Sequence, residues 1–213
     1  MSQVRVKICG VTTPDDIRMV AEAGANAVGL NFYPQSPRYI DPRNAATLLR
    51  ALPPLIDAVG VFVGLKTRQV CALAYQLGLH SVQCFGDITD IEDSAPFRRI
   101  AAFRIQDRAG LDEIERYLDR CQTAGAMPGA VLVDAYVEGQ LGGTGQTAPW
   151  QLLAEFRPGV PLILAGGLTP ENVGEAIRVV RPFAVDVASG VESAPGRKDP
   201  DKVKRFIEAA RRA

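Results

Sequence analysis

The chain has 213 residues, of which 47% are hydrophobic and 23% charged, and its 24 basic and 24 acidic side chains balance. This neutrality gives no electrostatic footprint for nucleic acid or an anionic membrane, and no apolar run approaches the roughly 18 residues of a membrane span. Four distant cysteines and the lack of a signal-peptide pattern favour a cytoplasmic protein with reduced thiols. The single histidine, His80, excludes histidine-based metal clusters, so we expect no metal site.

Strand-like and helix-like segments alternate along the chain. Apolar, β-branched runs predict eight strands, at 5–10, 27–32, 56–63, 81–85, 100–105, 130–135, 161–165 and 184–188. Helical patterns follow them at 14–23, 42–52, 68–77, 88–95, 111–121, 149–156, 170–179 and 200–212. Eight such units with nearly continuous apolar strands are typical of an α/β TIM (β/α)8 barrel, here a single domain over residues 1–213. An open doubly wound sheet is disfavoured, because no Gly-x-Gly-x-x-Gly follows the first strand.

Capping residues followed by proline mark the predicted start of four helices. These pairs are Thr13-Pro14, Asp41-Pro42, Thr169-Pro170 and Asp199-Pro200.

Polar residues and glycines gather where the predicted strands end. They are Cys9, Ser36, Arg38, Gln83, Asp134, Gly166, Gly167, Ser189 and Gly190. A glycine-rich run at 142–145, which includes Gly143, follows the sixth predicted strand. The active sites of parallel barrels lie at the carboxyl ends of the strands. We therefore expect these residues to converge on one site.

The first and sixth strands supply candidate groups for proton transfer. Lys7 and Cys9 share one face of the first strand, and a thiol needs a cationic or dipolar neighbour to act as a base. Lys7 could supply that charge, or it could form a buried ion pair with Asp186 on the eighth strand. Asp134 ends an otherwise apolar strand, where it could cap the following loop or, with its pKa raised by burial, donate a proton.

Four loops suggest ligand contacts. The amides of Gly166, Gly167 and Gly190 can approach a phosphate, although these glycines could instead form helix-entry turns. The glycine-rich segment 136–149 predicts a lid that closes over the pocket. Arg38, on a loop stiffened by two prolines, could bind a planar carboxylate or remain a solvated surface charge.

Over essentially its whole length, the chain resembles the phosphoribosylanthranilate isomerase family of tryptophan biosynthesis. The motifs that carry the resemblance are Lys-Ile-Cys-Gly at 7–10, Gly-Leu-Asn-Phe at 29–32, Ser-Pro-Arg at 36–38, Leu-Val-Asp at 132–134, Gly-Gly-Thr-Gly at 142–145 with Trp150, Leu-Ala-Gly-Gly-Leu at 164–168, Pro-Glu-Asn-Val at 170–173, Val-Asp-Val at 185–187, Ser-Gly-Val-Glu at 189–192 and Pro-Gly-Arg-Lys-Asp at 195–199. Each motif is short, but their joint order and spacing are specific.

The resemblance implies an Amadori rearrangement of N-(5-phosphoribosyl)anthranilate without a cofactor, in which a small phosphosugar is the ligand. By the same resemblance, Asp134 is the general acid, Cys9 is the general base and Arg38 holds the anthranilate carboxylate. The further residues expected around the substrate are Gln83, Phe85, Gly143, Gly166, Gly167, Asp186, Ser189 and Gly190. The sequence leaves the oligomeric state open.

Two positions depart from the family pattern. Phe85 stands where the family usually has a histidine, and Ala188 stands where a serine is common. His80 does not replace the missing histidine, because it precedes the fourth strand and should lie at the opposite end of the barrel. The alternative to an isomerase is therefore a phosphosugar-binding barrel that has lost or altered its catalytic activity.

Two other barrel enzymes that act on phosphorylated sugars are disfavoured. A ribulose-phosphate epimerase would need more histidines, and an indoleglycerol-phosphate synthase would need a Lys-Glu pair that we do not find.

Overall fold

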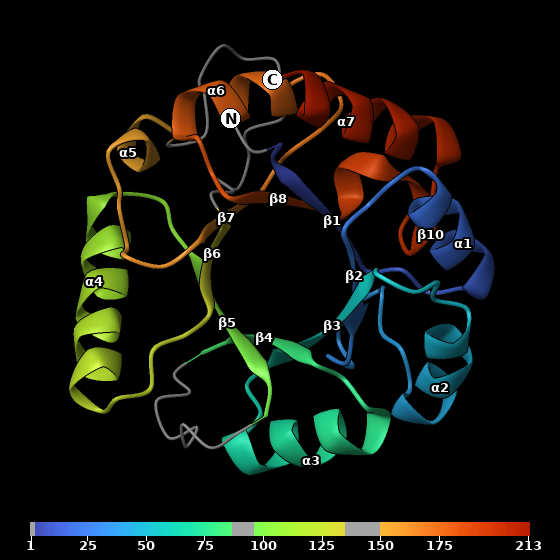
Figure 1. The fold of residues 1–213 in the computed structure, drawn as a ribbon, viewed down its shortest axis with the longest axis horizontal. Coiled ribbons are helices and arrows are strands. Elements are labelled where there is room, and N and C mark those ends of the chain that lie inside the picture. Colours follow the sequence, from blue (N-terminus) through green and yellow to red (C-terminus); the bar gives the residue numbers. More distant parts are fainter. Residues whose placement is uncertain (1–2, 87–95, 135–149) are drawn as a thin grey trace.

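A computed structural model describes residues 3–86, 96–134 and 150–213. Within these ranges eight parallel strands form a closed barrel in sequence order (Figure 1). The strands are β1 (Arg5–Cys9), β2 (Ala27–Asn31), β3 (Asp57–Val63), β4 (Ser81–Phe85), β5 (Arg98–Arg104), β6 (Ala130–Asp134), β7 (Leu162–Ala165) and β8 (Ala184–Val187). Pairing of β8 with β1 closes the barrel. The predicted TIM barrel is thus confirmed.

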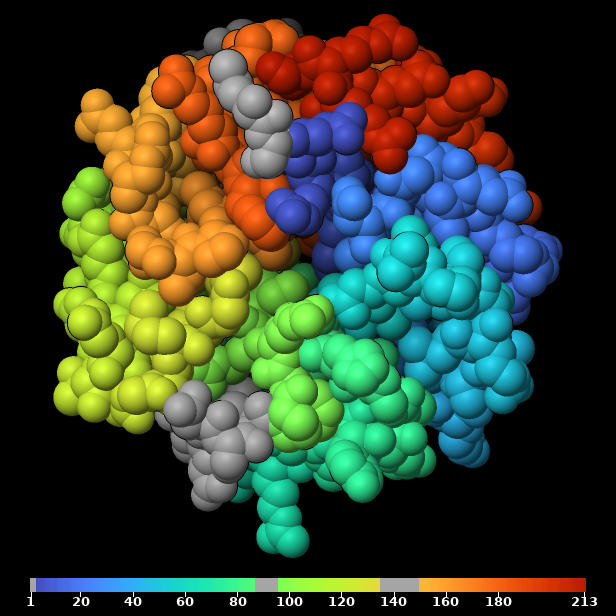
Figure 2. Space-filling view, in the orientation of Figure 1, coloured from blue at the N-terminus to red at the C-terminus, as the bar shows by residue number. Residues whose placement is uncertain are grey.

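The helices form a ring outside the barrel (Figure 1). They are α1 (Pro14–Glu22), α2 (Pro42–Arg50), α3 (Thr67–Leu77), α4 (Arg108–Thr123), α5 (Trp150–Ala154), α6 (Val173–Val180) and α7 (Pro200–Arg212). In the space-filling view the N-terminal segment lies beside the C-terminal one, as closure by β1 and β8 requires (Figure 2). The predicted helix at 88–95 and the predicted lid at 136–149 lie outside the described residues.

Two apolar layers hold the barrel together. The larger layer lies between the strands and the helices. A smaller cluster fills the barrel interior, and its buried members are Ala102, Ala130, Leu132, Ile163, Ala165 and Ala184, with Phe85 and Ile100 packed against them. The Phe85 ring therefore points from β4 into the barrel interior. No helix among the described residues is long and apolar enough to cross a membrane.

Three of the four predicted helix starts are confirmed. Thr13, Asp41 and Asp199 each accept a hydrogen bond from a backbone N–H of the first turn, and a proline follows each of them. The fourth prediction is wrong, because α6 begins three residues later than Pro170, after Asn172. There the Asn172 side chain accepts from the backbone N–H of Thr169 (2.8 Å) and donates to the Gly167 carbonyl (3.0 Å), which favours a turn over a helical start.

Other element boundaries also differ from the prediction. Helix α4 starts at Arg108 instead of residue 111, because Asp107 caps it by accepting from the Gly110 N–H (3.2 Å). After β8 the chain forms a short 3-10 turn, η1 (Ser189–Val191), and then an unpredicted hairpin of β9 (Glu192–Ala194) and β10 (Arg197–Lys198). Strands of two or three residues are too short to leave a periodic pattern in the sequence.

Candidate active site

The carboxyl ends of the strands surround a cavity of about 800 Å³. This volume is within the range of ligand pockets in proteins. The predicted site residues that line it are Cys9, Arg38, Gln83, Phe85, Asp134, Gly166, Gly167, Asp186, Ser189 and Gly190. The structure therefore brings together every predicted site residue except Gly143, which lies outside the described residues.

A buried polar network forms part of the cavity wall, which Gln83 and Asp186 line. The ammonium of Lys7 on β1 donates to Asp186 on β8 and to Gln83 on β4, both at 2.9 Å. All three residues are buried, and Lys7 pairs with Asp186 in the barrel register. Burial alone would lower the pKa of Lys7, but the charge of Asp186 and the nearby Cys9 outweigh it and raise that pKa. Lys7 therefore stays protonated as part of a buried ion pair.

Lys7 also lowers the pKa of the Cys9 thiol. Burial raises the pKa of the Cys9 thiol, Lys7 opposes the rise and Asp186 adds to it, so that the pKa lies above its ordinary value. The two roles left open for Lys7 therefore coexist, because it pairs with Asp186 and also partly offsets the desolvation of Cys9. The thiol is thus the main form of Cys9 at neutral pH.

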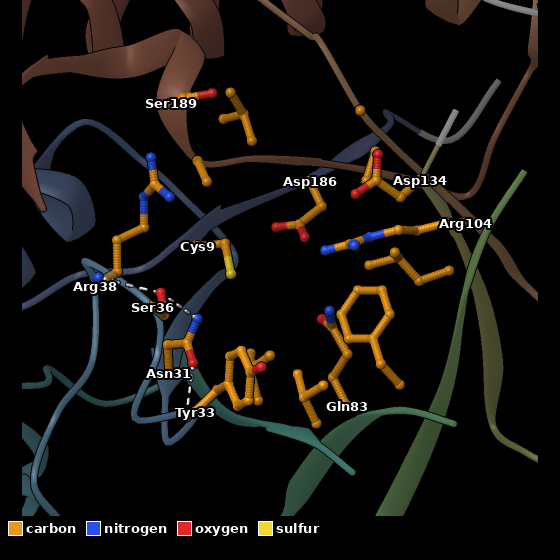
Figure 3. A pocket seen from close by; sticks show the side chains of 18 of the residues that line it. Cys9, Asn31, Tyr33, Ser36, Arg38, Gln83, Arg104, Asp134, Asp186 and Ser189 are labelled. Atoms are coloured by element: carbon orange, nitrogen blue, oxygen red, sulfur yellow. Dashed lines mark hydrogen bonds between the residues drawn. The ribbon is translucent and has the colours of Figure 1, made fainter. Parts of the chain in front are cut away.

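Asp134 lies on the far side of the cavity from Cys9, with Asp186 between them in the view of Figure 3. Strand β6 ends at Asp134, which pairs in register with Arg104 at the end of β5. The guanidinium of Arg104 lies 5.7 Å from the centre of the Phe85 ring, and both side chains line the cavity. Sequence reasoning missed Arg104. The only signal for it was its position at a strand end, and β5 ends at Arg104 instead of Ile105 as predicted.

Arg38 is anchored at the edge of the cavity. The Ser36 hydroxyl accepts from the Arg38 backbone N–H, and Asn31 at the end of β2 donates to the same hydroxyl, both at 3.1 Å. The guanidinium donates through Nε and Nη2 to the two oxygens of Glu192, at 2.8 and 2.6 Å. Only 21% of the Arg38 side chain is exposed, so it is not a solvated surface charge.

The loops after β7 and β8 meet closely. Gly166 and Gly167 have φ angles of 93° and 61°, a backbone region that favours glycine. A Cβ atom at Gly190 would overlap the carbonyl oxygen of Leu168, so only glycine fits where the two loops touch. Both loops open onto the cavity.

His80 lies where the sequence placed it. It is exposed, immediately precedes β4, and lines a separate surface hollow with Asp57 and Arg98 at the amino ends of their strands. It therefore has no place in the cavity.

The model of the N-(5'phosphoribosyl)anthranilate (PRA) isomerase family matches residues 6–209 of this chain. The chain belongs to that family. The PRA isomerase of Trichlorobacter lovleyi is 46% identical over 212 residues, which is 99% of each chain. The crystal structure of phosphoribosylanthranilate isomerase from Thermotoga maritima has a TM-score of 0.85 and 39% identity, and covers 99% of this chain and 100% of its own.

A second solved PRA isomerase extends the comparison to a ligand. It was crystallised in complex with reduced 1-(o-carboxyphenylamino)-1-deoxyribulose 5-phosphate. The TM-score is 0.83 with 37% identity, and the match covers 99% of this chain and all of that one. These findings confirm the predicted family and place the chain among the isomerases of tryptophan biosynthesis.

Proposed function

We propose that this chain converts N-(5-phosphoribosyl)anthranilate to 1-(2-carboxyphenylamino)-1-deoxyribulose 5-phosphate, with Cys9 as general base and Asp134 as general acid. The observation that carries the proposal is that these two residues face one cavity from different strands, β1 and β6 (Figure 3). A pocket used only for binding would need neither a thiol nor a carboxyl group at these positions.

The walls of the cavity fit the two ends of this substrate. The loops with Gly166, Gly167, Ser189 and Gly190 would hold the phosphate through backbone N–H groups. Arg38 would hold the anthranilate carboxylate, because Glu192 occupies only its Nε–Nη2 edge and leaves the Nη1–Nη2 edge for a second planar partner. The ribose would then lie between Cys9 and Asp134.

The first step opens the sugar ring. Asp134 donates a proton to the ring oxygen, the bond between that oxygen and C1 breaks, and the nitrogen lone pair forms a protonated Schiff base at C1. Asp134 is left as a carboxylate. A general acid positioned in this way contributes about 10²–10⁴-fold to a rate.

The second step moves a proton away from C2. The Cys9 thiolate removes it, and the C2–H electron pair flows into the Schiff base to give an enolamine. The enolamine then returns the proton of its C2 hydroxyl to the Asp134 carboxylate and takes the proton held by Cys9 at C1. This forms the aminoketose and restores the Asp134 acid and the Cys9 thiolate, so no proton is gained or lost overall. Burial disfavours the thiolate, and the charge of Lys7 partly offsets this by lowering the pKa of Cys9.

The test is an isomerisation assay on purified wild type, Cys9→Ala and Asp134→Ala. We expect an active wild type, and each variant should lose about 10²–10⁴-fold in kcat while its circular dichroism spectrum stays unchanged. An inactive, folded wild type would favour the alternative of a binding barrel. If both variants kept more than about a tenth of the wild-type kcat, the acid and base assignments would be wrong.

The proposal extends to the setting of the reaction. A small phosphosugar is the ligand, residues 1–213 act as one domain, and the reaction takes place in the cytoplasm. The aromatic ring of Phe85 replaces the imidazole usual in the family, so Cys9 and Asp134 carry the proton transfers alone.

A further inference from the structure

Glu192 joins two cations at the edge of the cavity. Its carboxylate accepts from Nε and Nη2 of Arg38, at 2.8 and 2.6 Å, and from Nζ of Lys198 at 2.9 Å. The Glu192 side chain is 5% exposed and that of Lys198 is fully buried. Removing one partner from a buried charge cluster leaves another charge uncompensated, so these three groups depend on one another.

The hairpin after β8 fixes the position of the Glu192 carboxylate. Glu192 starts β9 and pairs in register with Lys198 on β10. The Glu192 carbonyl accepts from Nζ of Lys202 at 2.8 Å, and the Thr12 hydroxyl ties the hairpin to the loop after β1 by donating to the Gly196 carbonyl at 2.6 Å. Glu192 is therefore an anchored acceptor.

Lys198 links this acceptor to the loop that follows β8. Besides binding Glu192, its ammonium donates to the Ala188 carbonyl at 3.1 Å. Ala188 lines the cavity directly before Ser189 and Gly190. One buried ammonium thus connects the proposed phosphate loop with the partner of Arg38.

The aliphatic part of Arg38 is also held in place. A Cβ atom at Gly10 would overlap the Cδ of Arg38, so the arginine stem packs into the space that this glycine leaves directly after Cys9. With its stem against Gly10 and one edge of its guanidinium on Glu192, Arg38 loses little conformational freedom when it binds a ligand.

We propose that Glu192, fixed by Lys198, is a positioning residue that presents the free edge of Arg38 to the substrate carboxylate. The inference rests on the proposed function, because it requires that Arg38 binds this carboxylate. It assigns specificity for the anthranilate end of the substrate to a hairpin that itself makes no proposed substrate contact.

The charge state of Glu192 supports this role. Burial would raise its pKa, but hydrogen bonds from Arg38 and Lys198 outweigh burial and hold the pKa below its ordinary value. The carboxylate is therefore ionised at neutral pH and remains a full charge partner for Arg38.

The experiment compares binding of two product analogues, one with and one without the aromatic carboxylate, to wild type, Glu192→Gln, Arg38→Ala and the double variant. Glu192→Gln should weaken binding of the carboxylate-bearing analogue about tenfold, the lower range for a charge-assisted hydrogen bond. Binding of the other analogue should change less than about twofold. In turnover, KM should rise while kcat stays nearly constant, as expected for the loss of uniform binding.

Two further variants serve as references. Glu192→Asp keeps the negative charge and should bind the carboxylate-bearing analogue with an affinity between wild type and Glu192→Gln. Glu208→Gln removes a carboxylate that pairs with Arg212 at 3.3 Å on the exposed face of α7, and it should match wild type with both analogues. Thermal unfolding checks that each variant is folded, and if Glu192→Gln does not fold, the selective loss in Glu192→Asp decides the question.

The outcomes separate the two proposals. If Arg38→Ala weakens the binding of both analogues equally, Arg38 does not bind the substrate carboxylate, and that part of the proposed function fails. If Arg38→Ala weakens binding of the carboxylate-bearing analogue selectively but Glu192→Gln does not, the proposal that Glu192 positions Arg38 is wrong. In the supporting case the selective loss in Glu192→Gln disappears in the Arg38→Ala background, because the two residues act through one contact.

Discussion

Gly29 leaves open the space that the Sγ atom of Cys9 occupies. The two residues pair in register between β1 and β2, and a Cβ atom at Gly29 would lie 2.7 Å from this sulfur. Real Cβ atoms essentially never lie so close, so Gly29→Ala must move the thiol. A shift of about 1 Å in a reacting group can cost about 10²-fold in rate. We expect a kcat loss of this order in the isomerisation assay, with an unchanged circular dichroism spectrum.

Gly174→Ala is the matched control for this substitution. Gly174 lies in α6, where an added Cβ would have only ordinary contacts, the nearest atom lying 3.5 Å away on Arg178. Alanine is favoured over glycine inside a helix, so this variant should keep wild-type kcat and gain about 0.5–1 kcal/mol of stability. A Gly29→Ala variant as active as this control would show that the thiol position is not critical.

Lys7 and Asp186 should shift the pH profile in opposite directions. The raised pKa of Cys9 means that kcat/KM increases with pH as the thiolate forms in the free enzyme. Lys7 lowers this pKa and Asp186 raises it. Lys7→Met should therefore move the rise of kcat/KM, the ascending limb of the pH profile, to higher pH. Asp186→Asn should move this limb to lower pH.

The measurement is kcat/KM across the pH range in which each variant stays folded. Thermal unfolding defines that range, because removing one member of a buried pair costs about 3–5 kcal/mol of stability. Shifts of the two variants in the same direction would contradict the assignment of the limb to Cys9.

Phe85→Ala should act mainly on KM. The Phe85 ring lines the cavity and packs against the barrel interior, where it can stack on the anthranilate ring for about 0.5–1.5 kcal/mol beyond area burial. Its loss should raise KM roughly 2- to 10-fold. Phe85→His should leave the dependence of turnover on Cys9 and Asp134 intact. An inactive wild type that Phe85→His activates would instead mark an altered function.

Gly190→Ala should weaken phosphate binding. The new methyl group would overlap the Leu168 carbonyl and force the loops after β7 and β8 apart. Lost hydrogen bonds to a charged group predict at least a tenfold weaker inhibition by inorganic phosphate, on the order of 1.5–3 kcal/mol. Competitive inhibition constants for wild type and Gly174→Ala provide the comparison. Unchanged inhibition would place the phosphate elsewhere.

The barrel could be predicted because its determinants are local. Each strand appears as a short apolar run, and Thr13, Asp41 and Asp199 cap the helices that follow them in the sequence. Thr169-Pro170 shows the limit of this reasoning. A capping residue followed by proline also suits a turn, and the side chain of Asn172 selects the turn.

The membership of the site could be predicted, but its pairings could at most be offered as alternatives, as for Lys7 and Asp186. The carboxyl ends of parallel strands meet, so Cys9 and Asp134 could be assigned to one cavity before their surroundings were known. The partner of Lys7 depended on how β1 aligns with β8, which sequence periodicity does not determine. Glu192 pairs with Arg38 through a hairpin of strands too short to leave a periodic pattern, although the Ser-Gly-Val-Glu sequence at 189–192 is one of the motifs that carry the family resemblance.

The decisive charge pairs join the first part of the chain to its last. Lys7 and Asp186 are separated by 179 residues, and Arg38 and Glu192 by 154. Contacts of such long sequence separation form slowly, because the loop-closure entropy must be overcome before they form. During synthesis Cys9 and Lys7 emerge early, but Asp186, whose charge also acts on the Cys9 thiol, emerges only when the chain is nearly complete. A nascent chain can therefore carry the Cys9 thiol and Lys7 before Asp186 is present, and the buried charge network is complete only once β8 has been added.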